Sequence, residues 1–183
     1  MQALPTRLAG LVLLAPRVRG DERGFFQETW RADAWADAGV PADFVQDNHS
    51  RSRRGTVRGI HFQTQPGQGK LVRCARGAVW DVVVDLRTDS PSFGEWESFE
   101  LDDAGGRQLW IPIVFGHGFC VLSETADFVY KCSSYYDPAT EAGIRFDDPD
   151  VAIRWPELEL SCSERDRTAP RLADVAGTLP FRM

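Results

Sequence analysis

The chain has 183 residues, of which 43% are hydrophobic and 26% charged, and its formal net charge is −6. This length suits one domain with a full core, and the composition excludes disordered, collagen-like and coiled-coil proteins. The negative charge argues against a nucleic-acid-binding protein, because such proteins usually carry a basic surface. A small anionic ligand is still compatible, since arginines gather locally at Arg51, Arg53, Arg54 and Arg58.

Short strands separated by turns are predicted along most of the chain. The first part contains a strand at 10–14, a turn at 21–24, a strand at 25–30 and a helix at 31–38 that ends at Gly39 and Pro41. An extended segment at 44–50 and a polar turn at 52–55 follow. Further strands are expected at 56–63, 70–76, 78–86, 95–101, 108–112, 118–123 and 126–135.

The rest of the chain is predicted to hold little regular structure. Residues 137–143 are interpreted as a turn with helical character, and the tail from about 156 as a segment with a short helix at 170–175 that packs on the barrel. The run 80–86 should be buried on both faces at its centre. About ten short strands with almost no helix predict one all-β domain over 1–183, a sandwich or barrel.

Several sequence features bear on location and on the core. The cysteines Cys74, Cys120, Cys132 and Cys162 show no C-x-x-C spacing, so neither a zinc site nor a redox pair is indicated. The longest early apolar run, 10–14, is too short to cross a membrane or to serve as a signal peptide, which favours a cytoplasmic protein without a membrane partner. Aromatic residues expected in the core are Phe25, Phe26, Trp80, Trp96 and Trp110.

Two spaced motifs carry the first chemical signal. They are Gly55-x5-His61-x-Gln63-x6-Lys70-x6-Gly77 and Gly106-x5-Pro112-x4-His117. The spacing resembles the two signature motifs of the cupin superfamily, which implies a double-stranded β-helix, or cupin-like jelly roll, with a few short helices. Metal-binding cupins place a second histidine and an acid where this chain has Gln63 and Lys70, and a protonated lysine offers a metal no lone pair. The pocket is therefore expected to hold no metal and no cofactor.

The residues left in that pocket suit the removal of a proton from carbon next to a carbonyl. His61 is a candidate base, Lys70 supplies a cation for an enolate oxygen, and His117 adds a second imidazole. Six segments in order then resemble the dTDP-4-dehydrorhamnose 3,5-epimerase family over about residues 23–166. They are RGFFQE from 23, FVQDNHS from 44, VRGIHFQ from 57, GKLVR from 69, FGHGF from 115 and FVYK from 128.

The resemblance implies an isomerase that inverts C3 and C5 of dTDP-4-dehydro-6-deoxyglucose without a cofactor, as a homodimer. It makes His61 the base, Asp166 its paired carboxylate, Tyr130 the acid on the opposite ring face and Lys70 the group that steadies the enolate. His117 is expected to contact the sugar, and Arg23 and Arg58 the diphosphate. The full set of implied substrate contacts is Arg23, Glu28, Gln46, Asp47, Asn48, Arg58, Lys70, His117, Glu141 and Arg165.

The sequence leaves three alternatives open. A mono-epimerase would invert C3 or C5 alone in a dTDP-deoxysugar pathway. A metal-dependent cupin enzyme would bind stoichiometric iron, manganese or zinc. A non-catalytic sugar-nucleotide binding module would bind dTDP without exchanging substrate protons with solvent.

Overall fold

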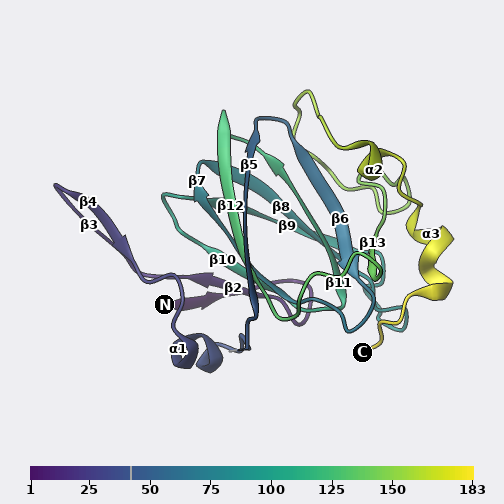
Figure 1. The fold of residues 1–183 in the computed structure, drawn as a ribbon, viewed down its shortest axis with the longest axis horizontal. Coiled ribbons are helices and arrows are strands. Elements are labelled where there is room, and N and C mark those ends of the chain that lie inside the picture. The colour runs from purple at the N-terminus through teal and green to yellow at the C-terminus, as the bar shows by residue number, and fades with distance from the viewer. Residues whose placement is uncertain (42) are drawn as a thin grey trace.

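Two antiparallel β-sheets face each other in the computed structural model, which describes residues 1–41 and 43–183 (Figure 1). The first sheet contains, in spatial order, β1 (Gln2–Leu4), β2 (Val12–Ala15), β10 (Gln108–Ile111), β7 (Lys70–Arg76), β12 (Thr125–Cys132) and β5 (Gln46–Arg53). The second contains β13 (Glu141–Gly143), β6 (Val57–Gln63), β11 (Phe115–Val121), β8 (Ala78–Asp85) and β9 (Trp96–Asp102). The all-β prediction is confirmed.

Outside the two sheets the chain forms a hairpin and a few short helices. The hairpin joins β3 (Val18–Asp21) to β4 (Gly24–Gln27), and it projects away from the sandwich at the end opposite to the C-terminal helices (Figure 1). The helices are α1 (Ala32–Asp37), α2 (Glu164–Arg167) and α3 (Leu172–Val175), followed by a 3₁₀ turn at Ala176–Thr178. No helix among residues 1–41 and 43–183 is long and apolar enough to cross a membrane.

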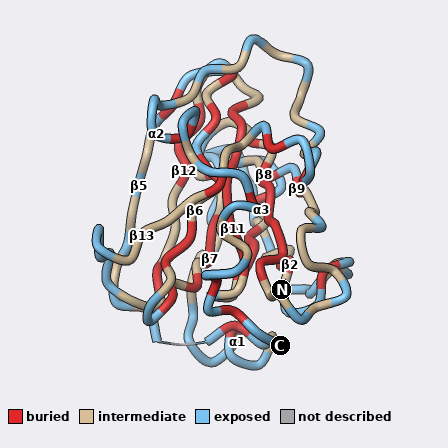
Figure 2. Tube along the Cα trace, turned by 90° about the vertical axis from the view of Figure 1, so that its right-hand side faces the viewer, coloured by how far each residue is buried: buried red, intermediate tan, exposed pale blue. Residues whose placement is uncertain are grey.

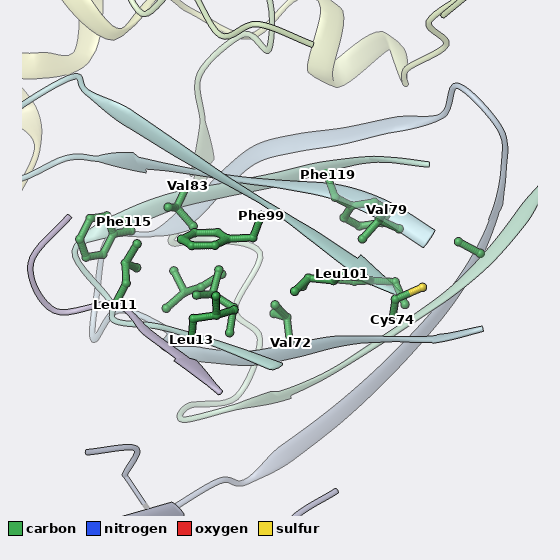
Figure 3. Packing of buried hydrophobic residues seen from close by; sticks show 14 of the residues in the cluster. Leu11, Leu13, Val72, Cys74, Val79, Val83, Phe99, Leu101, Phe115 and Phe119 are labelled. Atoms are coloured by element: carbon green, nitrogen blue, oxygen red, sulfur yellow. The ribbon is translucent and has the colours of Figure 1, made fainter. Parts of the chain in front are cut away.

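The main core fills the space between the sheets. Alternating side chains from both sheets meet there, among them Leu13, Val72, Val83, Leu101 and Phe119 (Figure 3). Successive residues of a strand point to opposite faces, so each sheet also carries a second apolar face that needs a cover. The interior strands β8 and β11 are therefore buried along most of their length, as their red colour in Figure 2 shows.

Two smaller clusters cover the outer faces. Helix α1 places Trp35 against Leu14, Leu71 and Trp110 on the six-stranded sheet. The C-terminal segment places Leu172, Leu179 and Phe181 against Ile60, Val82 and Val84 of the five-stranded sheet. The tail packs on the barrel, as expected, because it covers an apolar face of β6 and β8 that would otherwise be exposed.

Several local predictions differ from the structure. The last part of the expected turn at 137–143 forms β13, because its backbone completes the hydrogen bonding of β6. Strand β5 runs on to Arg53, where a turn was expected from 52, since it pairs with β12 as far as Thr125. Phe25 and Phe26 are 64% and 71% exposed, so the prediction that they belong to the core is wrong for this chain.

Candidate active site

A cavity of about 450 Å³ lies between the two sheets and brings most of the predicted site residues together. Strands β6 and β11 contribute from one sheet, strands β7 and β12 from the other, and the segment that enters α2 closes one side. The aromatic rings of Phe119 and Phe128 form part of its wall. Its polar side chains include Arg58, His61, Lys70, His117, Tyr130, Arg165 and Asp166.

A close approach of two glycines sets the spacing between the histidines. His61 on β6 and His117 on β11 are directly opposite each other in the strand register. A Cβ on Gly59 would lie 2.5 Å from the Cα of Gly118, and Gly59 has a φ of +136°, which favours glycine. The register shifts between His117 and Phe119, so a β-bulge directs the histidine into the cavity.

His61 forms a dyad with Asp166. Its Nε2 lies 2.7 Å from Oδ1 of Asp166, a carboxylate that is 4% exposed. Oδ2 of Asp166 accepts a hydrogen bond from the backbone N–H of Gly59, while Ser163 caps α2 by accepting from the backbone N–H of Asp166. Burial raises the pKa of Asp166, but the hydrogen bond from His61 and its positive charge outweigh it, so the pKa falls below its usual value. An ionised Asp166 holds the Nε2–H of His61 and leaves Nδ1 free as a base.

Tyr130 and Lys70 face the same cavity from the opposite sheet. Burial raises the pKa of the Tyr130 phenol, which therefore keeps its proton and is able to act as an acid. Burial lowers the pKa of Lys70 below its usual value, and the neighbouring Cys132, Glu141 and Asp81 offset this effect only in part. Among the described residues, Lys70 forms no ion pair or hydrogen bond through its side chain. Its ammonium is therefore available to a ligand oxygen.

His117 forms a second dyad, with Asp81 on strand β8. Its Nε2 lies 2.8 Å from Oδ2 of Asp81, and Asp81 is fully buried. Burial raises the pKa of Asp81 above its usual value, and His117 and Lys70 offset this effect only in part. The sequence analysis missed this carboxylate, although an acid inside the run WDVVVDL was a signal that it contained. Ser163, the cap that places Asp166, was missed as well.

The remaining predicted contacts form the rim of the site. Arg58 donates from Nε to the hydroxyl of Ser52 at 3.0 Å. Arg165 donates to Glu141 at 2.7 Å, and the Tyr136 hydroxyl donates to the same carboxylate at 2.7 Å. Burial raises the pKa of Glu141, but these two hydrogen bonds outweigh it and keep the carboxylate ionised.

Some predicted residues do not reach the cavity within one chain. Arg23 lies on the projecting hairpin with its side chain paired to Asp21, and Glu28 follows the hairpin and lies 3.8 Å from Arg31 (Figure 1). Asp47 points out of the sandwich and pairs with Lys131. Gln46 and Asn48 lie on the other face of β5, where the amide of Gln46 donates to Oδ1 of Asn48 at 3.0 Å. Asn48 is also opposite Tyr130 in the strand register and hydrogen-bonds its side chain, so it lies next to the cavity.

The donor set at the cupin positions does not match a metal site. The described residues contain no group of three His, Cys, Asp or Glu side chains that could hold a metal ion. The amide of Gln63 is engaged with the loop before β13, since its oxygen accepts from the backbone N–H of Asp137 at 3.2 Å. It therefore acts as a structural group.

Comparison with known proteins identifies the family. The profile of a family described as dTDP-4-dehydrorhamnose 3,5-epimerase matches residues 5–174. Proteins of that description from Shigella flexneri and Pseudomonas aeruginosa are 44% and 47% identical, and each match covers 96% of this chain and 98% of the relative. A solved epimerase from Legionella pneumophila, in complex with dTDP-4-keto-L-rhamnose, is 43% identical with a TM-score of 0.95, covering 100% of this chain and 98% of the other.

A second solved structure has a different specificity. It is a 3′-monoepimerase from Streptomyces bikiniensis in complex with dTDP-quinovose, 38% identical with a TM-score of 0.91, covering 97% of this chain and 92% of the other. The likeness to these structures agrees with the predicted cupin-like jelly roll. The chain belongs to the dTDP-4-dehydrorhamnose 3,5-epimerase family.

Proposed function

We propose that this protein inverts C3 and C5 of dTDP-4-dehydro-6-deoxyglucose to give dTDP-4-dehydrorhamnose, without a cofactor. The observation that carries the proposal is the His61–Asp166 dyad, which opens onto a cavity with Lys70 and Tyr130 on the facing sheet. The relatives described above act on this class of sugar nucleotide by name. The geometry supports the same chemistry here.

The reaction depends on the C4 ketone. Nδ1 of His61 takes the proton from C3 or C5, and the electron pair moves through the new C=C bond onto O4. Asp166 stabilises the resulting imidazolium, while the ammonium of Lys70 stabilises the enolate oxygen. The phenol of Tyr130 then protonates the carbon from the opposite ring face, which inverts the centre and leaves a phenolate. His61 returns its proton to solvent and the phenolate takes one from solvent before the second inversion. Both carbons flank C4, so the same enolate contact serves each inversion.

The main alternative is the inversion of a single centre. A relative from Streptomyces niveus, described as a 3-epimerase, is 46% identical, while the 3,5-epimerase from Shigella flexneri is 44% identical. Overall identity therefore does not separate the two specificities. Both use one base and one acid at each inverted carbon, and the residues described above suit either outcome.

One experiment tests the function and its alternatives. The protein is incubated with dTDP-4-dehydro-6-deoxyglucose in D₂O, and the sugar is examined by NMR. Deuterium at both C3 and C5 with inverted configuration supports the proposal, and deuterium at one carbon supports a mono-epimerase. Binding of dTDP without exchange supports a binding module. His61→Asn is expected to abolish exchange while dTDP binding survives.

The expected absence of a metal is tested separately. Elemental analysis of the purified protein is expected to find no stoichiometric iron, manganese or zinc, because Gln63 and Lys70 make poor ligands. A stoichiometric metal whose removal abolishes exchange would favour a metal-dependent cupin enzyme.

A homodimer explains why Arg23 and Glu28 lie outside the cavity of their own chain. The hairpin that carries Arg23 projects from the sandwich (Figure 1), and its strand β4 exposes the rings of Phe25 and Phe26. Exposed aromatic side chains on a projecting hairpin suit burial against a second copy. We propose that each hairpin reaches the cavity of its partner and supplies Arg23 to the diphosphate.

Mixed dimers test that arrangement. Arg23→Ala and His61→Asn are each expected to be weakly active or inactive alone. After mixing and subunit exchange, half of the sites in a mixed dimer would combine an intact His61 with the intact Arg23 of the other chain, and activity would return. No recovery in a mixture shown to contain mixed dimers would place Arg23 in its own subunit or outside the site.

Two further expectations remain part of the proposal. Residues 1–183 are taken as one domain, which is supported by β1 at one end and Phe181 at the other packing on the same sandwich. A cytoplasmic location is supported by four free cysteines, of which Cys74, Cys120 and Cys132 are buried.

A further inference from the structure

Asp81 occupies a position where the strand pattern calls for an apolar residue. Its neighbours on the same face of β8, Val79 and Val83, belong to the packed layer between the sheets (Figure 3). Asp81 itself has no exposed surface. A carboxylate at such a position is costly to remove from water unless nearby charges and hydrogen bonds compensate it. The other buried acids of the chain show how a structural carboxylate meets that cost.

Asp81 differs from these acids in its hydrogen bonding. Asp85, also on β8 and fully buried, accepts from Arg87, Ser90 and Ser92 with both carboxylate oxygens in use. Asp148 likewise uses both oxygens, on the backbone N–H groups of Asp150 and Leu172. In Asp81 only Oδ2 is used, by His117, and Oδ1 has no hydrogen-bond partner among the described residues. A purely structural role does not account for this arrangement.

The contacts of Asp81 point instead toward the cavity. His117, its hydrogen-bond partner, lines the cavity together with Lys70. Lys70 has no ion pair in the part of the chain that the structure describes, and the acidic groups that act on its charge are Asp81 on β8, Glu141 on β13 and the thiol of Cys132 on β12. Glu141 is already bound by Arg165 and Tyr136. Of the two carboxylates near Lys70, Glu141 is therefore paired with an arginine and Asp81 is not.

We propose that Asp81 is a positioning residue for the epimerisation, acting through His117 and Lys70. It accepts the Nε2–H of His117, which leaves Nδ1 as a hydrogen-bond acceptor facing the cavity, and it supplies the countercharge for the Lys70 ammonium. In this tautomer His117 accepts from a sugar hydroxyl and does not donate to the keto oxygen, so the enolate oxygen is left to Lys70. The inference rests on the function proposed above.

The charge balance of the group supports this division of roles. In the proposed state, an ionised Asp81, a protonated Lys70 and a neutral His117 have charges that sum to zero. Lys70 and His117 line the cavity with Phe119 and Phe128, and Asp81 is hydrogen-bonded to His117. A second proton on His117 would place another cation beside Lys70. A protonated Asp81 would donate to Nε2 of His117 and force the proton of the neutral ring onto Nδ1. The tautomer of His117 therefore reports the state of Asp81.

Asp81→Asn tests the proposal, because it keeps the shape of the side chain and removes its charge. We expect kcat to fall about 10- to 100-fold, the range for losing a charge-assisted hydrogen bond. KM should stay within about threefold, since the dTDP contacts are untouched. Lys70 also loses its countercharge, so the alkaline limb of the kcat profile should move to lower pH by about one pH unit.

Asp85→Asn is the matched control, with the same chemical change on the same strand at the same burial. It should lower the melting temperature and leave the pH profile of kcat in place. A kcat for Asp81→Asn within twofold of wild type, or an unmoved alkaline limb, overturns the proposal. Absence of exchange in wild type measured in the same assay would instead refute the proposed function.

A measurement on the wild-type protein covers the case in which Asp81→Asn does not fold. In ¹⁵N-histidine NMR spectra, His117 is expected as the Nε2–H tautomer throughout the pH range of activity. His117 can be assigned through its loss in His117→Gln. An Nδ1–H tautomer, or an imidazolium in the active range, would overturn the proposal.

Discussion

Asp166→Asn tests the proposed mechanism most directly, because the structure limits how an amide can occupy that position. Oδ1 of Asp166 faces Nε2 of His61 at 2.7 Å, and Oδ2 faces the backbone N–H of Gly59 at 3.3 Å. An asparagine has one acceptor and one donor for these two partners. The helix cap survives, since Asp166 donates its backbone N–H to Ser163. The variant is therefore expected to fold.

Each orientation of the amide impairs the base. With its oxygen toward His61, the amide N–H₂ meets the N–H of Gly59, and a buried donor without a partner costs about 1–3 kcal/mol. The imidazolium also loses a charged hydrogen bond, worth about 1.5–3 kcal/mol. The first effect is the same in the ground state and the transition state, so it lowers the stability of the protein. Only the second effect raises the barrier, by about 1.5–3 kcal/mol, or about 10- to 10²-fold in kcat. With its nitrogen toward His61, the amide donates a hydrogen bond to Nε2, so the neutral ring carries its proton on Nδ1 and the base is lost.

The assay compares kcat for deuterium exchange at C3 and C5 in the variant and in wild type. Calorimetry with dTDP serves as the control for binding and should stay close to the wild-type value, while a melting curve should show a folded protein whose melting temperature is lower by a few degrees. Residual kcat above one tenth of wild type, with normal product stereochemistry, would refute the assignment of Asp166 as the partner of the base.

Two further predictions concern the acid and the pH dependence of stability. Tyr130→Phe keeps the ring beside Phe128 but removes the phenol, so proton removal by His61 should continue while inversion slows about 10²-fold or is confined to one centre. The measurement compares the deuterium content of the recovered substrate with that of the product. An unchanged rate and stereochemistry would exclude Tyr130 as the acid. The hydrogen bond from Arg51 lowers the pKa of Asp127 to about 2. The stability it adds is present above the ordinary carboxyl pKa and is lost as the pH falls through about 2, so Asp127→Asn should melt with a weaker acid dependence than wild type between about pH 5 and pH 2. If the melting temperatures of wild type and Asp127→Asn fell equally with pH, this prediction would be wrong.

The strand pattern was predictable where turn residues and apolar alternation agree. Strand β7 has the predicted bounds, Lys70–Arg76, because the loop before it and Gly77 after it mark both ends. Strand β13 was not predictable, since its three residues are extended only through pairing with β6. The partner of β4 was missed for a similar reason: Val18–Asp21 is polar and mostly exposed, without an apolar alternation to reveal it.

The site residues also fall into those that the sequence could predict and those that depend on tertiary contacts. Motif spacing indicated His61, Lys70 and His117, and the resemblance indicated Tyr130 and Asp166; the structure brings all of them to one cavity. Spacing could not show that the hairpin of Arg23 points away from the cavity of its own chain, because the direction of a hairpin depends on tertiary contacts (Figure 1). Asp81 was interpreted as part of a buried strand, because the register that pairs β8 with β11 is not visible in the sequence.

Two histidine–aspartate pairs thus lie on neighbouring strands, and their surroundings suit them to different tasks. Asp166 lies in the short helix α2, where the hydrogen bond from His61 and, to a smaller extent, the backbone N–H of Gly59 lower its pKa, and its partner His61 is partly exposed. A base that exchanges its proton with solvent after each turnover needs such access. Asp81 lies in the core, and its partner His117 is nearly buried. That pair is poorly placed to exchange protons with solvent, and well placed to keep a fixed tautomer and a fixed charge beside Lys70.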